Sequence, residues 1–321
     1  TYCGCNVIVS RDKAIVERYL ATLLPEIAMV ARALDGGHRR TAQLHLGGGT
    51  PTYFPPEALE RLHGTLVEHF DLQDDAEVAL EADPCVTTPQ HVETLARLGW
   101  QRVSMGVQDF DPKVQEAVNR VQSFEQTLAL AEHCRASGFA SVNVDLMYGL
   151  PHQTVDSFRR TLDLVVERLR PDRVSLFGYA HVPWLKAHQR KLDEATLPGP
   201  DERLALFHAG LGAFVGAGYE FIGLDHFARP DDELACALRD GTLRRNFMGH
   251  TTQEGVELIG FGATAISELA GSYAQSERGL DEWRSAVETR GLATMRGIRL
   301  SADDQERRWL ISRLISLGAV E

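Results

Sequence analysis

The chain has 321 residues, of which 44% are apolar and 24% charged, so it is long enough to bury a full hydrophobic core as an ordinary globular protein. Its formal net charge of −12 argues against a surface that coats nucleic acid, because phosphate binding requires a basic field. No apolar run of bilayer-spanning length and no signal-peptide pattern occurs, so we expect no membrane span and a cytoplasmic location.

Two cysteines stand one residue apart near the start of the chain, in Tyr2-Cys3-Gly4-Cys5. This spacing, ahead of the first βα unit, favours a thiolate site over a disulfide framework. Iron–sulfur clusters are held by such closely spaced thiolates. The other cysteines are isolated, and we expect them to be structural or surface thiols: Cys85, Cys134 and Cys236. Because Thr1 is not an initiator methionine and lies inside a cysteine motif, we expect the chain to be a fragment.

Strand-like and helix-like segments alternate through the first half of the chain. The predicted strands are 43–46, 78–84, 102–108, 141–146 and 172–179, and the predicted helices between them are 56–69, 90–98, 124–137 and 157–169. Such alternation is typical of βα units around a parallel sheet. The pattern therefore predicts most of a (β/α) barrel, open or closed.

The second half of the chain is less regular. Residues 183–200 form a connection rich in Pro, Lys and Gln, and a helix is predicted at 201–216. Segments 219–223 and 256–265 have strand patterns that would extend the sheet beyond the barrel. From about residue 281 onward the chain is polar, and we expect it to be helical.

The predicted strands share one feature at their carboxyl ends, where each has a polar residue or glycine: Gly47, Glu81, Gln108, Asp145 and Tyr179. In barrels and open α/β sheets this edge carries the ligand site. After the first strand comes Gly47-Gly48-Gly49-Thr50-Pro51, whose backbone a ligand can approach because no Cβ intervenes. On its own, the glycine triplet favours a tight turn, and a phosphate-binding loop is the other alternative.

With the cysteine loop and the glycine triplet in this βα order, the whole chain resembles the radical S-adenosylmethionine (SAM) enzymes, and among them the oxygen-independent coproporphyrinogen III oxidases (dehydrogenases). Segments 225–234 and 244–253 resemble this branch more than heme-carrying relatives. The resemblance implies an α/β fold, a partial (β/α)6 TIM-like barrel whose first strand precedes Thr1. It also implies a core barrel at 1–217, a sheet extension at 218–280 and the start of a helical C-terminal region at 281–321.

The resemblance also assigns residues to cofactors. Cys3 aligns with the third cysteine of the family's CxxxCxxC motif, which binds a [4Fe–4S] cluster, whereas Cys5 is not needed as a ligand. Two SAM molecules are expected, lined by Tyr2, Gly48, Gly49, Thr50, Glu81, Gln108, Arg120, Asp145, Ala180 and Ile266. Without the resemblance, Glu81 would be equally compatible with a helix N-cap partner or a solvated rim charge. For Arg120 alone, an ordinary surface arginine would be the favoured interpretation.

The implied function is that of an oxidoreductase in anaerobic heme biosynthesis. A 5′-deoxyadenosyl radical would drive oxidative decarboxylation of two propionates of coproporphyrinogen III to vinyl groups, giving protoporphyrinogen IX. We expect a monomer that uses an electron donor for the cluster and an unidentified electron acceptor. Two alternatives stay open, a heme chaperone with the same core and a metal-free barrel enzyme that binds phosphate at the glycine triplet. Arg244 and Arg245 would either meet the substrate's propionates or be solvated charges.

Overall fold

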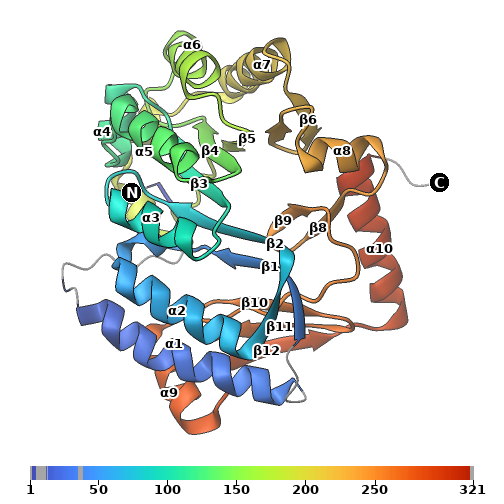
Figure 1. Cartoon of the computed structure of the whole chain (residues 1–321). Coiled ribbons are helices and arrows are strands. Elements are labelled where there is room, and N and C mark those ends of the chain that lie inside the picture. Colours follow the sequence, from blue (N-terminus) through green and yellow to red (C-terminus); the bar gives the residue numbers. More distant parts are fainter. Residues whose placement is uncertain (1, 5–11, 13, 35–38, 319–321) are drawn as a thin grey trace. The chain divides into compact units, whose positions relative to one another are not determined.

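The computed structural model describes residues 2–4, 12, 14–34 and 39–318. The chain forms two compact units, each assembled from separate stretches of sequence (Figure 1). The first unit comprises residues 1–5, 46–53 and 79–236, and the second comprises residues 6–45, 54–78 and 237–321. Because these units interleave along the chain, the consecutive division at residues 217 and 280 stays a prediction.

The main sheet has seven strands in the order β1-β2-β3-β4-β5-β7-β6. They are β1 (Arg39–Leu46), β2 (Phe70–Ala82), β3 (Arg102–Gln108), β4 (Ser141–Tyr148), β5 (Arg173–Gly178), β6 (Glu220–Gly223) and β7 (His226–Ala228). Strands β2 to β5 pair in parallel, as their alternation with helices predicts, whereas β7 is antiparallel to both β5 and β6. The predicted strand at 219–223 therefore does extend the sheet, but the short β7 lies between it and β5.

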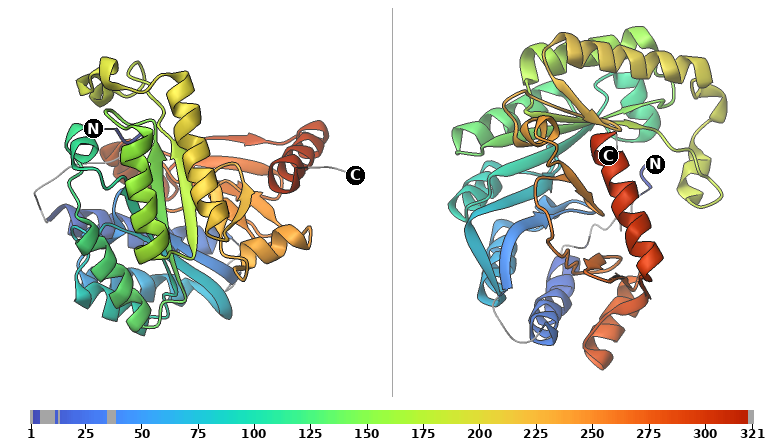
Figure 2. Two further views of the ribbon diagram at one scale, coloured as in Figure 1. Left: turned by 90° about the horizontal axis from the view of Figure 1, so that it is seen from above. Right: turned by 90° about the vertical axis from the view of Figure 1, so that its right-hand side faces the viewer.

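Helices follow the strands of the first unit. They are α3 (Pro89–Arg97), α4 (Pro112–Val118), α5 (Phe124–Ala136), α6 (Val155–Asp163), α7 (Pro200–Gly216) and α8 (Glu233–Arg239), with short helical turns at Pro51–Tyr53, Leu164–Leu169, Ala187–Lys191 and Glu194–Thr196. Thr88, Ser123 and Thr154 start α3, α5 and α6 with capping boxes, which satisfy backbone donors that a helix start leaves unpaired. Figure 2 shows α6 and α7 side by side near β4 and β5.

Alternating residues give the strands of the first unit one apolar and one polar face. Met105, Val144 and Leu146 have fully buried side chains. The residues between them, such as Ser104 and Asp145, point to the opposite face because successive side chains alternate along a strand. The helices thus cover an apolar face, and the polar face is left for the site.

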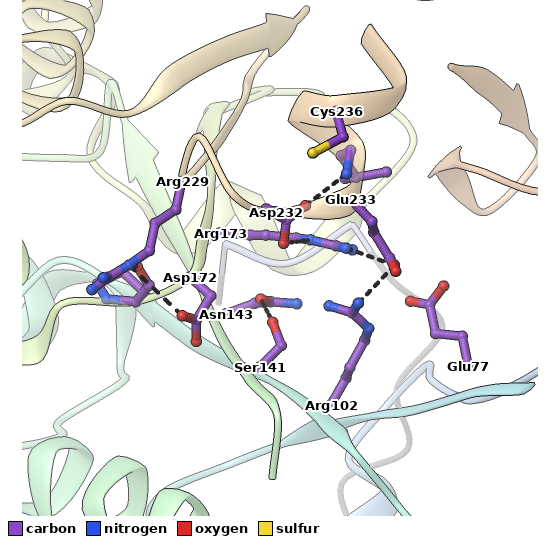
Figure 3. Close-up of polar contacts among 12 residues, drawn as sticks. Glu77, Arg102, Ser141, Asn143, Asp172, Arg173, Arg229, Asp232, Glu233 and Cys236 are labelled. Atoms are coloured by element: carbon purple, nitrogen blue, oxygen red, sulfur yellow. Dashed lines mark hydrogen bonds and ion pairs between the residues drawn. The ribbon is translucent and has the colours of Figure 1, made fainter. Parts of the chain in front are cut away.

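The amino ends of the strands are tied to α8 by ion pairs (Figure 3). Glu233 accepts hydrogen bonds from Arg102 at 2.6 Å and from Arg173 at 3.0 Å. Arg173 also donates to Asp232 at 2.8 Å, and both of these side chains are largely buried. Because breaking a buried pair leaves an uncompensated charge, this cluster holds the β7–α8 segment to the start of the strands.

The second unit contains α1 (Ala14–Ala33), α2 (Pro56–His69), β8 (Arg244–Asn246), β9 (Gly249–Thr251), β10 (Ile266–Leu269), β11 (Ser272–Ser276), α9 (Leu280–Arg290), β12 (Thr294–Arg299) and α10 (Ala302–Leu317). Its core includes the buried Glu26, which accepts hydrogen bonds from the Gly262 amide at 2.8 Å and the Trp283 indole at 3.1 Å. Burial raises the pKa of Glu26. No helix among the described residues is long and apolar enough to cross a membrane.

Two predictions for this unit need correction. Residues 256–265 are not a strand, since they contain only an isolated bridge at Leu258. The physical reason is backbone conformation, because Gly262 and Thr264 adopt positive φ angles of 94° and 67°, which an extended strand cannot accommodate. The region after residue 281 is helical in α9 and α10 but also contributes β12 to a three-stranded antiparallel sheet with β10 and β11.

Helix α7 approaches β5 so closely that Gly210 has no room for a larger side chain. A Cβ at Gly210 would lie 2.5 Å from Cδ2 of the fully buried Leu176. We expect Gly210→Val to lower the free energy of unfolding by about 1–3 kcal/mol through overpacking. Gly212 lies in the same helix with open space around it, so Gly212→Val is the matched control and should lower the free energy of unfolding clearly less. Equal losses in urea unfolding of the two variants would contradict this packing account.

Candidate active site

The polar face of the first unit gathers side chains in register across neighbouring strands. Gly106 of β3, Asp145 of β4, Ser175 of β5 and His226 of β7 are successive pairing partners in one row. In the preceding row Glu81 of β2 pairs with Ser104 of β3. The predicted site residues Glu81 of β2 and Asp145 of β4 therefore lie in the same sheet on either side of β3.

Asp145 is the carboxylate at the centre of this row. Ser104 donates a hydrogen bond to it at 3.4 Å, and Ser175 donates a second one. Burial, and next the nearby Glu81 charge, raise the pKa of Asp145 to about 6, against the lowering effects of Ser175, His226 and Ser104. Burial makes the ionised form of this carboxylate costly in free energy. A carboxylate of this kind, on a polar face away from the apolar core, is typical of functional sites.

Gln108 and Arg120 converge at the end of β3. Gln108 is the last residue of the strand and has a positive φ of 66°, which is uncommon for a residue with a side chain. Arg120, in the loop after α4, donates to the Gly106 carbonyl at 2.7 Å and lies 3.7 Å from the Asp83 carboxylate. A Cβ at Gly106 would be 2.8 Å from the Gln108 side-chain amide nitrogen and 3.2 Å from the Arg120 guanidinium, so a larger residue there would displace these side chains.

Two polar atoms of this pair are buried without a hydrogen-bond partner, Oε1 of Gln108 and Nε of Arg120. Buried polar atoms in folded proteins are nearly always paired, and an unpaired one costs free energy. Two side chains that converge at the end of a parallel strand therefore carry one unpaired acceptor and one unpaired donor. This arrangement is complementary to a polar ligand that carries both a donor and an acceptor.

The glycine segment after β1 leaves its backbone open. Gly48 has a φ of 87°, and a Cβ at Gly48 or Gly49 would meet no atom within 4 Å. The segment ends at Thr50, whose carbonyl accepts a hydrogen bond from the Tyr53 amide at 3.0 Å. The segment thus offers exposed backbone amides and carbonyls, as the sequence predicts.

The cysteine loop is attached to the segment that follows β5. Gln189, 1% exposed, donates to the Tyr2 carbonyl at 2.8 Å and to the Ala180 carbonyl at 3.1 Å. A His188 ring nitrogen lies 2.7 Å from the Cys3 carbonyl. Tyr2 packs against a buried cluster that includes Tyr179 and Leu150. These contacts place the predicted residues Tyr2, Cys3 and Ala180 together.

Comparison with known proteins places this geometry in a family. The radical SAM superfamily profile matches residues 1–165. Oxygen-independent coproporphyrinogen III oxidases from Escherichia coli and Synechocystis sp. are 46% and 43% identical over 314 residues, which is 98% of this chain and 68% and 67% of those proteins. The solved E. coli coproporphyrinogen III oxidase (HemN), described as a radical SAM enzyme, matches with a TM-score of 0.95 over 98% of this chain and 72% of that one. The chain belongs to the oxygen-independent coproporphyrinogen III oxidase family.

Membership of this oxidase family confirms the predicted partial (β/α) barrel and implies a [4Fe–4S] cluster and SAM. The unpaired atoms of Gln108 and Arg120 and the open glycine backbone fit a ligand such as SAM, which carries amine, carboxylate and ribose groups. Cys3 has a partly buried thiol outside any disulfide, and thiolates bind iron in such clusters. No group of three potential metal ligands occurs within the described part of the chain, and Cys5 lies outside it.

The structure places the other residues singled out in the sequence in different surroundings. Ile266 starts β10 in the second unit, and its contact with a cofactor stays a prediction. Arg244 is paired with Glu254 at 2.8 Å, whereas Nη1 of Arg245 is buried without a partner. Ser104, Ser175 and His226, which surround Asp145, were not predicted. Strand alternation from Asp145 and its register with β3 and β5 would have been the signal for the two serines.

The raised pKa of Asp145 has a measurable consequence in the oxidase without cofactors. The folded protein binds this proton more tightly than the unfolded chain, so stability is greatest below the ordinary carboxyl pKa and is lost as the pH rises through about 6. Relative to Asp145→Asn, the wild type should lose up to about 3 kcal/mol of unfolding free energy between about pH 4 and pH 7.

Urea unfolding at a series of pH values measures this loss, and other titrating groups cancel in the comparison with the variant. Asp156→Asn is the control, because the Asp156 side chain is 85% exposed and should produce no such difference. Parallel pH profiles for the wild type and Asp145→Asn would show that Asp145 has an ordinary pKa.

Proposed function

We propose that the protein catalyses the oxygen-independent oxidative decarboxylation of coproporphyrinogen III to protoporphyrinogen IX, in which two propionates become vinyl groups. Relatives with 43–46% identity over nearly the whole chain carry the name of this activity. The single observation in the structure that carries the proposal is the convergence of the Gln108 and Arg120 side chains over Gly106, each with one buried polar atom that has no hydrogen-bond partner. Both side chains stand at the carboxyl end of a parallel strand, where barrel enzymes bind their reactants.

The residues divide between two SAM molecules in this proposal. Gly48, Gly49, Thr50 and Glu81 would hold the first, whose methionine group reaches the cluster bound through Cys3. Gln108, Arg120 and Asp145 would hold the second. Tyr2 and Ala180 would complete the walls of these sites. The chemistry that cluster and SAM supply when bound is a 5′-deoxyadenosyl radical for hydrogen-atom removal from a propionate.

The side chains of the protein bind the SAM molecules and fix their orientation. Asp145, when ionised, accepts hydrogen bonds from ribose hydroxyls, and its two serine neighbours fix its orientation. Arg120 pairs with the carboxylate of the methionine part, and Gln108 accepts from its amine. These contacts are formed on a rigid sheet edge, which sets the position of the cofactor before the substrate enters. The electron donor, the electron acceptor, a monomeric state and the cytoplasmic location stay predictions.

The direct test is anaerobic incubation of the reconstituted intact protein with coproporphyrinogen III, SAM and a reductant. Protoporphyrinogen IX and two CO₂ per substrate are the expected products. Stoichiometric retention of heme without porphyrinogen turnover would instead indicate a carrier.

The assignment of the thiol at Cys3 predicts different results at the two neighbouring cysteines. Cys3→Ser should abolish both cluster retention and SAM cleavage in the intact protein, since serine is a poor iron ligand. Cys5→Ser is the matched control and should retain the cluster. Iron and sulfide analysis after anaerobic reconstitution measures both, and loss of iron from Cys5→Ser would overturn the ligand assignment.

The two-cofactor proposal predicts binding stoichiometries. The intact wild-type protein should bind two SAM molecules, whereas Arg120→Ala and Asp145→Ala should bind about one and retain the cluster, while product formation stops. The loss arises because truncation removes charge-assisted hydrogen bonds, each of which contributes about 1.5–3 kcal/mol. Anaerobic equilibrium binding counts the sites. A single site in the wild type, or full turnover by both variants, would refute the second site.

A further inference from the structure

We propose that Asp109 and Gln115 are positioning residues that hold Gln108 and Arg120 in their ligand-binding geometry. This inference rests on the proposed function, in which Gln108 and Arg120 bind the second SAM. Both positioning side chains are buried, with exposed fractions of 1% and 6%, so they act through their neighbours and not by contact with a ligand.

The backbone at Gln108 needs such support. The pairing of β3 with β4 matches Gly106 to Asp145 and Gln108 to Leu146, so Val107 is an extra residue in a bulge. Gln108 leaves this bulge with its positive φ of 66°. A conformation of this kind persists only where the surrounding structure enforces it. The groups that enforce it must act on Gln108 or on the residue after it.

Asp109 is that next residue, and its carboxylate is fixed from three sides. Thr161 of α6 donates to Oδ1 at 2.5 Å, the Asp111 amide donates to the same oxygen at 2.9 Å, and Gln153 donates to Oδ2 at 2.6 Å. Gln153 also accepts the Gly149 amide at 2.6 Å. The end of β3 is thereby tied to the β4–α6 loop and to α6 itself.

Gln115 connects this anchored end to the Arg120 loop. Its amide nitrogen donates to the Asp109 carbonyl at 2.8 Å and to the Gln122 carbonyl at 2.7 Å, and its oxygen accepts the Gln122 amide at 3.1 Å. Gln122 in turn accepts a hydrogen bond from Arg120 at 3.4 Å through its side chain. One glutamine side chain therefore fixes the distance between the backbone that carries Gln108 and the loop that carries Arg120.

The arrangement is tightly packed as well as hydrogen-bonded. No water-sized space remains between these polar groups and the apolar side chains of Val114, Val118 and Leu150. Water therefore cannot replace a hydrogen bond that a substitution removes without a shift of the surrounding chain. Loss of either Asp109 or Gln115 should move the Gln108–Arg120 pair and leave the glycine segment and the cysteine loop unaffected.

The experiment compares SAM binding to the anaerobically reconstituted holoenzyme of the wild type with binding to the variants Gln115→Met and Asp109→Asn. Gln115→Met keeps the side-chain volume but removes the hydrogen bonds that Gln115 makes to Asp109 and Gln122. Thr161→Val removes one of the hydrogen bonds to Asp109, together with the one that Thr161 accepts from the Phe110 amide at 3.2 Å, and keeps the test available if a stronger variant does not fold. The second SAM should bind at least about tenfold more weakly in Gln115→Met, equal to about 1.4 kcal/mol. Thr161→Val should show a smaller loss in the same direction, and the first SAM and the iron content should not change.

Asp172→Asn is the matched control, because Asp172 accepts the Val142 amide at 2.8 Å at the opposite ends of the strands. It should lower the melting temperature without affecting the second SAM. If it weakens the second SAM as much at an equal loss of melting temperature, general destabilisation explains the effect and the inference is wrong. If Gln115→Met and Thr161→Val bind like the wild type while Arg120→Ala loses the second SAM, the inference fails but the proposed function stands. If Arg120→Ala also keeps both sites, the proposed role of Arg120 fails.

Discussion

The bulge at Val107 is the constraint on which the candidate active site depends. Because one extra residue enters β3 there, Gln108 turns back over Gly106 and Asp109 points into the interior. Arg120 reaches the same point and donates to the Gly106 carbonyl, and both side chains lie where a Cβ at residue 106 would meet them. The geometry thus creates two unpaired polar atoms at the edge of a rigid sheet, and a bulge beside a functional site is a recurrent way to redirect a side chain.

Charged side chains at the two ends of the strands in the first unit have different roles. At the amino ends, Asp232 and Glu233 form ion pairs with Arg102 and Arg173, and these pairs stabilise the fold. Near the carboxyl ends, Asp145 is held beside Glu81 with a raised pKa. A buried carboxylate whose pKa is raised in this way is typical of a functional site.

Much of this organisation could be predicted from the sequence, for identifiable reasons. The helix at 56–69 and the strand at 102–108 match α2 and β3 because their periodicity is strong and their ends carry clear signals. The apolar residues of 256–265 resembled a strand, but positive φ angles at Gly262 and Thr264 turn the chain there. The three-residue β7 is too short to give a pattern. Strand-end positions led to the prediction of site roles for Gln108 and Asp145. Gln115 and Thr161 look like ordinary helix residues, and each reaches Asp109 only through tertiary packing.

The central claim is that the unpaired atoms at the end of β3 are ligand contacts. The most direct measurement is a structure of the anaerobically reconstituted protein with SAM bound. We predict that Oε1 of Gln108 and Nε of Arg120 each lie within hydrogen-bonding distance of a SAM molecule, with Gln108 still at a positive φ. SAM bound at the glycine segment alone at saturating concentration, with both atoms still unpaired or paired only with protein groups, would contradict the account.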